Sequence, residues 1–141
     1  MSEIVKYSKL PIGYIESSPS CRSRETANLA FGGYEKLNRN LVHVGPYYEN
    51  LGARTNYLRK YLLNIPIKQG TNTIISAHNS VIVKELFDNY ETAESIDKYN
   101  NKLSLEEGGF YVISRKNGKL NLVHEFHNFN KFSLNFFERK Y

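Results

Sequence analysis

The stretch that decides the fold reads SSPSCRSRETA and runs from Ser17 to Ala27. The apolar run 12–15 leads into it, and a helical pattern leads out of it as far as Gly32-Gly33. This order predicts a buried parallel strand over 12–17, a tight polar turn and the start of a helix. The N–H groups at a helix start point outward, and the helix dipole favours negative charge there. The turn therefore predicts an anion-binding junction.

Two arginines lie in this turn, Arg22 and Arg24. Guanidinium groups offer paired N–H donors that match a phosphate, and cations are mildly disfavoured at a helix N-terminus without a local reason. We expect a helix from Arg22 or Ser23 to Phe31, with these apolar side chains packing inward: Ala27, Leu29, Ala30 and Phe31. A simple pair of surface arginines is the alternative interpretation.

A second stretch, TNTIISAHNS at 71–80, has the same design. Its near-continuous apolar character over 72–77 predicts a second parallel strand, and His78 follows that strand directly. Ligands of open α/β sheets bind at the carboxyl ends of the strands. Arg22 and His78 would then converge on one crevice and bind a phosphate there, although a lone histidine is more often structural.

The rest of the chain alternates helical and extended patterns. Apolar residues recur at helical spacing over 49–63, and a helix is expected over 80–87. Two strands, 110–114 and 120–124, flank Asn117-Gly118, which is a strong type I′ hairpin signal.

The sequence therefore predicts an α/β fold, with an open, mostly parallel sheet flanked by helices and a C-terminal antiparallel hairpin. We expect one domain over 1–141 and no internal repeat. A further short strand at 41–44 is one interpretation of an ambiguous region, which Gly45-Pro46 would end.

Composition limits the class of protein. The chain has 141 residues, of which 40% are hydrophobic and 23% charged, as in a globular protein. No apolar run approaches the ~20 residues of a membrane span, and residues 1–10 lack the apolar segment of a secretory signal. The single cysteine excludes an internal disulfide, so we expect a cytoplasmic protein. The net charge is +5, but the basic residues are scattered, so neither nucleic acid nor a membrane is expected as partner.

Other chemistries fit the residues poorly. A cysteine phosphatase needs an arginine about six residues after its cysteine, and Ala27 stands six positions after Cys21. His43, His124 and His127 have no carboxylates at metal-ligand spacing, so we expect no metal site and no cofactor.

The motifs resemble those of the histidine phosphatase superfamily, the phosphoglycerate mutase-like proteins. Residues 18–27 resemble the family motif S-P-x-x-R-x-x-[EQ]-T-A, and Cys21 to Gly32 is similar to the C-R-x-R-E-T-A-x-L-A-F-G of small bacterial members. Residues 75–79 resemble the second, strand-end histidine motif. The resemblance covers about 10–126 and implies phosphoryl transfer by a hydrolase, with Arg22 and His78 contacting the phosphate. The implied partner is a phosphorylated small molecule or a phosphoprotein.

One family element is missing. The resemblance places the nucleophile in an R-H-G motif at the end of a preceding strand, and this sequence contains no Arg-His pair. The first strand and most of a helix of the family fold would then be absent, and the strands at 12–17 and 72–77 would lose a neighbour. The general acid stays unassigned, with His43 and Glu49 as candidates.

Three interpretations stay open. The chain is an N-terminally truncated histidine phosphatase, a relative without a nucleophile that binds phosphorylated ligands without turnover, or an unrelated small α/β binding module. In each of the three, the chain as given is expected to lack phosphatase activity.

Overall fold

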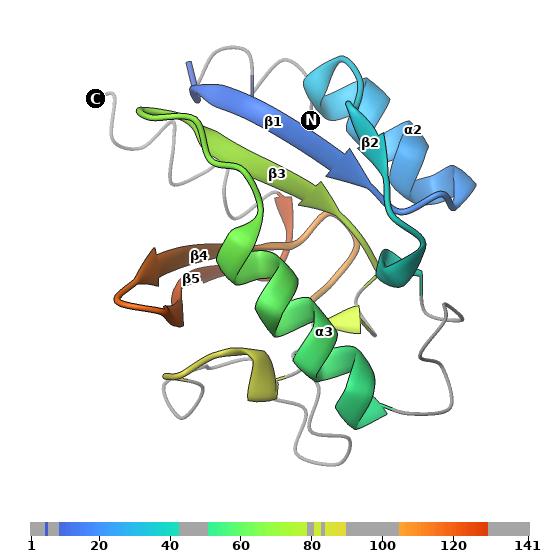
Figure 1. Cartoon of the computed structure of the whole chain (residues 1–141). Helices are drawn as coiled ribbons and strands as arrows, with labels where there is room; N and C mark the ends of the chain where they lie inside the picture. The colour runs from blue at the N-terminus through green and yellow to red at the C-terminus, as the bar shows by residue number, and fades with distance from the viewer. Residues whose placement is uncertain are drawn as a thin grey trace. The chain divides into compact units, whose positions relative to one another are not determined.

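The computed structural model describes residue 5 and residues 9–42, 51–78, 81–82, 84–89 and 105–129. The order of elements along these residues, drawn in Figure 1, is β1 (Ile12–Ser17), α2 (Cys21–Phe31), β2 (Lys36–Leu37), the 3-10 helix η1 (Arg39–Leu41), α3 (Leu51–Asn64), β3 (Asn72–Ser76), the 3-10 helix η3 (Lys84–Leu86), β4 (Phe110–Lys116) and β5 (Lys119–Phe126). The predicted α/β class, with parallel strands first and a hairpin last, is confirmed.

The parallel sheet has the strand order β2-β1-β3, so β1 lies in the middle. Ser17, the last residue of β1, lies opposite Leu37 of β2 and Ser76 of β3. All three strands therefore end at the same edge of the sheet. Strands β1 and β3 pair directly with each other.

The two ends of helix α2 are set by residues next to them in the sequence. Ser20 caps its N-terminus, and Gly32 ends it in the left-handed region at φ 84°, which glycine adopts without strain. Its inward face is formed by Ser23, Ala27 and Ala30, which recur three and four residues apart. The inward placement expected for Leu29 is wrong, since Leu29 is 72% exposed. It lies two residues from Ala27 and therefore on the opposite side of the helix.

Contacts divide the chain into two compact units, 1–54 with 64–81 and 55–63 with 82–141. The first contains the parallel sheet, and the second contains the hairpin. Each has buried apolar residues of its own. Those of the first unit are Ile15, Ala27, Ala30, Leu41, Ile65 and Val81, and those of the second are Leu58, Leu62, Leu86, Phe87, Leu120 and Leu122.

The hairpin forms around the predicted turn. Asn117 and Gly118 both have positive φ, 52° and 71°, as a type I′ turn requires. Strands β4 and β5 are longer than expected, and their register shifts between Val112 and Ile113, where β5 contributes one extra residue.

Other expectations differ from the structure. The suggested strand at 41–44 does not form at Leu41, which ends the 3-10 helix η1, and residues 43–44 lie outside the described residues. A helix was expected over 80–87. In the described part of this range, the structure has a single turn at Val81 and the short 3-10 helix Lys84–Leu86. Strand β2 was not expected, because two exposed residues carry no period in the sequence.

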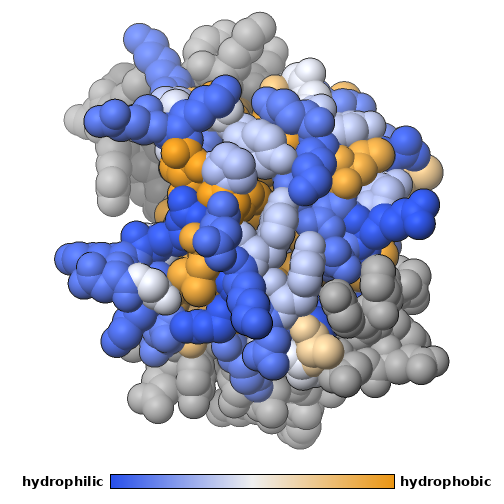
Figure 2. Space-filling view, viewed as in Figure 1, coloured by the Kyte–Doolittle hydropathy of each residue, from blue (hydrophilic) through white to orange (hydrophobic). Residues whose placement is uncertain are grey.

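Among the described residues, no helix is both long and apolar enough to span a membrane. Hydrophilic side chains predominate on the side of the molecule seen in Figure 2, and apolar ones appear in small separate groups. This agrees with the few large apolar residues that are exposed, which are scattered along the sequence.

Candidate functional site

The turn after β1 is built from serine hydroxyls. Ser17 and Ser18 are fully buried, and the Ser18 Oγ accepts a hydrogen bond from the Ser20 N–H at 3.3 Å. The Ser20 Oγ in turn accepts one from the Ser23 N–H at 3.4 Å, while the Ser20 carbonyl accepts one from the Arg24 N–H. The hydroxyls therefore fix the first turn of α2 directly after the end of β1.

The same turn is tied to the end of β3. The Ser18 N–H donates to the Ser76 carbonyl at 2.8 Å, and the Ser76 Oγ donates to the Ser23 carbonyl at 2.9 Å. These bonds join the two stretches that the sequence singled out, 17–27 and 71–80. The end of β3 therefore lies beside the first turn of α2.

Arg22 is the second residue of α2 and its side chain is exposed. Within the described part of the chain, no hydrogen bond or ion pair engages its guanidinium. Arg24 differs, because its Nη2 donates to the Cys21 Sγ at 3.5 Å. That bond, and a further one with Tyr34, raise the pKa of the Arg24 guanidinium. Of the two arginines, Arg22 is the one available to a ligand.

His78 follows the end of β3 by two residues and is half-buried. Its carbonyl accepts a hydrogen bond from the Val81 N–H at 3.0 Å, which begins the next turn. The Nε2 atom is shielded from solvent. The Arg22 side chain, by contrast, is exposed.

The end of β2 adds two residues that the sequence analysis did not select. Asn38 is 6% exposed, its N–H donates to the Ser17 carbonyl at 2.9 Å, and its side-chain oxygen accepts from the Asn40 N–H. Arg39 comes next and is exposed. Because β2 is parallel to β1, Arg39 lies at the same strand-end edge as Arg22 and His78. The signal for Arg39 was weak in sequence, since β2 itself has only two residues.

A buried carboxylate lies near the end of β1, on the face opposite to Ser17. The Glu16 side chain is fully buried, its Oε2 accepts from the Tyr14 hydroxyl at 3.1 Å, and the Lys36 Nζ lies 3.9 Å from that oxygen. Burial and the hydrogen bond to Glu16 raise the pKa of Tyr14. Residues alternate between faces along a strand, so this carboxylate is directed away from α2.

The other candidates belong to the second unit or lie outside the described residues. His124 and His127 belong to or directly follow β5, in the second unit. His43 and Glu49, the candidate general acids, lie outside the described residues. In the portion of the chain that the structure describes, no group of three or more metal-ligating side chains is present.

Comparisons with protein-family models, curated proteins and solved structures found no match. The geometry of this edge and the motif resemblance are therefore the observations that bear on function.

Proposed function

We propose that the parallel-sheet unit binds a phosphomonoester group at the strand-end edge, with Arg22 as the main contact, and that the chain does not hydrolyse it. The observation that carries this proposal is the pair of hydrogen bonds through which Ser76 and Ser18 join the end of β3 to the first turn of α2. Arg22 is the second residue of α2, so its guanidinium and the helix N-terminus belong to the same turn, and both favour an anion.

The charges at the edge support an anionic ligand. The first turn of α2 contains no acidic residue. Arg22 and Arg39 are exposed there, and Glu16 is directed to the other face of the sheet beside Lys36. A dianionic phosphate would gain charge-assisted hydrogen bonds from a guanidinium that has no partner to give up among the described residues.

The proposed lack of turnover is based on the sequence. Phosphoryl transfer in the family that the motifs resemble passes through a phosphohistidine that follows an arginine. This chain has four histidines, and none of them follows an arginine. Arg22 and His78 can position a phosphate, but positioning alone does not supply the nucleophile.

The test is calorimetric titration of the purified protein with O-phosphoserine and with inorganic phosphate. Arg22→Ala is expected to weaken phosphate binding at least tenfold, since a charge-assisted contact contributes about 1.5–3 kcal/mol. Arg39→Ala is expected to have a smaller effect of the same sign.

Arg24→Ala is the matched control. It removes the same charge from the same helix, but Arg24 is engaged by Cys21 and Tyr34. Equal losses in the two variants would indicate general electrostatic attraction and remove Arg22 from the site. Unchanged affinity in Arg22→Ala would contradict the proposal.

A further inference from the structure

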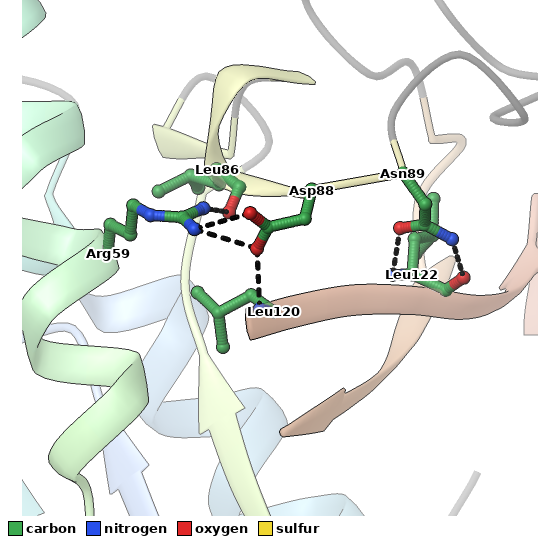
Figure 3. Close-up of polar contacts among 6 residues, drawn as sticks. All are labelled: Arg59, Leu86, Asp88, Asn89, Leu120 and Leu122. Atoms are coloured by element: carbon green, nitrogen blue, oxygen red, sulfur yellow. Dashed lines mark hydrogen bonds and ion pairs between the residues drawn. The ribbon is translucent and has the colours of Figure 1, made fainter. Parts of the chain in front are cut away.

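The outer edge of β5 in the hairpin unit is hydrogen-bonded at Leu120 and Leu122, although no strand lies along it in the described residues (Figure 3). The Leu120 N–H donates to the Asp88 carboxylate at 2.8 Å, and the Asp88 N–H donates to the Leu120 carbonyl at 2.8 Å. The Leu122 N–H donates to the Asn89 side-chain oxygen at 2.8 Å, and the Asn89 amide nitrogen donates to the Leu122 carbonyl at 2.9 Å. Asp88 and Asn89 therefore replace a neighbouring strand, and we name these two residues the edge clasp.

Three of these four bonds are made by side chains. The Asn89 amide supplies one donor and one acceptor to Leu122, as a peptide group of a neighbouring strand would. Arg59 orients the other half of the clasp, since its Nη2 lies 2.7 Å from both Asp88 carboxylate oxygens and its Nη1 donates to the Leu86 carbonyl. The edge thus depends on two polar residues, of which Asp88 is exposed and Asn89 half-buried.

The anchor of the clasp is separate from the clasp itself. Leu86 and Phe87 precede it and are buried to 0% and 2% exposure. On the other side, the Leu120 and Leu122 side chains are also buried, at 1% and 8%. The buried apolar side chains that hold this part of the hairpin unit are therefore different residues from the two of the clasp.

We propose that the edge clasp is a releasable guard, which opens while the hairpin stays folded and exposes β5 for antiparallel pairing with β5 of a second copy. An unpaired strand edge is a template for pairing with another chain, and proteins commonly block it. The clasp blocks it here with side chains, which local fluctuations release more readily than a ladder of backbone bonds.

The positions of the outward N–H and C=O groups on β5 favour a second copy of the chain as the partner. Leu120 and Leu122 both direct their N–H and C=O groups outward, so an antiparallel partner centred on Asn121 would pair Leu120 of each copy with Leu122 of the other. The edge is therefore complementary to itself. Two closed clasps make eight hydrogen bonds, whereas one such pairing makes four, so the closed single chain is favoured until the clasp is weakened.

The test is residue-resolved amide hydrogen exchange of the full chain. In the native protein, the Leu120 and Leu122 amides are expected to exchange faster than the Asn121 amide, which points to β4. Low concentrations of denaturant are not expected to change the exchange rates of Leu120 and Leu122, because the opening is local. Asn89→Asp keeps the size of the side chain but sets a carboxylate oxygen against the Leu122 carbonyl. It is expected to raise exchange of the Leu122 amide about tenfold and to leave Asn121 within twofold.

Oligomeric state is measured on the same samples by light scattering. Asn89→Asp is expected to dimerise at a concentration at which the native chain and the surface control Lys116→Gln remain monomeric. Three results would overturn the proposal: exchange of all three amides rising together, no change at Leu122, or an open edge without dimerisation. Because the first comparison uses the native chain, it holds even if the variant fails to fold.

Discussion

Gly13 lies where the pairing of β1 with β3 shifts register, between Ile12 and Tyr14. A Cβ atom at this position would meet the Thr71 Oγ1 and lie 2.9 Å from the Thr71 Cβ, closer than packed carbons allow. The turn at Lys68 is also close, with its Cβ at 3.1 Å. The glycine therefore permits the close approach of the segment before β3.

We accordingly expect Gly13→Ala to lower the free energy of unfolding by about 1–3 kcal/mol, the usual range for an overpacked site. The measurement is urea denaturation followed by circular dichroism. Thr71→Gly in the same chain should recover part of the loss, because it removes the two atoms that the new methyl group meets. A double variant no more stable than Gly13→Ala would show that the close approach to Thr71 is not the cause.

Asp88 connects stability to pH. The hydrogen bond from Arg59, and then that from the Leu120 N–H, lower the pKa of its carboxyl group. The folded chain therefore binds this proton less readily than the unfolded chain, and stability contributed by Asp88 is present above the ordinary carboxyl range near pH 4 and lost as pH falls below it.

Asp88→Asn should therefore melt at a lower temperature than the native protein at pH 7, and the difference between the two melting temperatures should shrink as the pH falls below the ordinary carboxyl range near pH 4. The amide retains an acceptor for Leu120, so the comparison isolates the charge. A constant difference down to pH 2.5 would mean that the ionised carboxylate is not what stabilises this contact. Glu125→Gln is a control for the general acid sensitivity of the hairpin.

At the scale of elements, variants of the α2 N-cap can change phosphate binding without changing stability. The Ser20 Oγ accepts the Ser23 N–H, so Ser20→Ala is expected to lower stability by about 1 kcal/mol. Ser20→Asp keeps a cap of equal quality but adds a negative charge at the proposed phosphate edge. We expect near-native melting of Ser20→Asp together with at least tenfold weaker phosphate binding. Native affinity in that variant would place the anion elsewhere.

The elements differ in how far local sequence determines them. Helix α2 and the hairpin turn were predictable, because Ser20, Gly32 and Asn117-Gly118 act on neighbouring residues. Strand β2 was not, because a distant contact completes it. The Glu35 carboxylate accepts the Ile15 N–H at 2.6 Å and the Glu35 N–H donates to the Ile15 carbonyl, so a side chain extends a two-residue strand along β1.

In both units, a side chain makes the hydrogen bonds that a neighbouring strand would otherwise make. Glu35 pairs with Ile15 in the parallel sheet, and Asn89 pairs with Leu122 in the hairpin. Neither carboxylate nor amide shows this role in the sequence, because the paired residues are 20 and 33 positions apart. Short sheets in this chain are therefore completed by contacts that no local pattern reveals.

For the whole molecule, the topology explains which parts of the site could be predicted. Arg22 and His78 each follow an apolar strand, so their place at one edge followed from the rule for parallel sheets. Arg39 follows β2, and without that strand its position at the edge had no signal. The burial of the His78 Nε2 depends on side-chain packing and is likewise invisible in the sequence.

Binding of phosphate without turnover can be tested directly. If phosphate is bound without a nucleophile, the purified protein should hydrolyse p-nitrophenyl phosphate no faster than a buffer blank from pH 5 to pH 8. After incubation with a labelled phosphodonor, it should retain no acid-labile phosphate. His78→Ala should leave both results unchanged and should weaken phosphate binding less than Arg22→Ala, because the Nε2 atom is shielded while Arg22 is exposed. Enzyme-like hydrolysis that disappears in His78→Ala would instead make His78 part of a working active site. The chain would then need a nucleophile of another kind, because none of its four histidines follows an arginine.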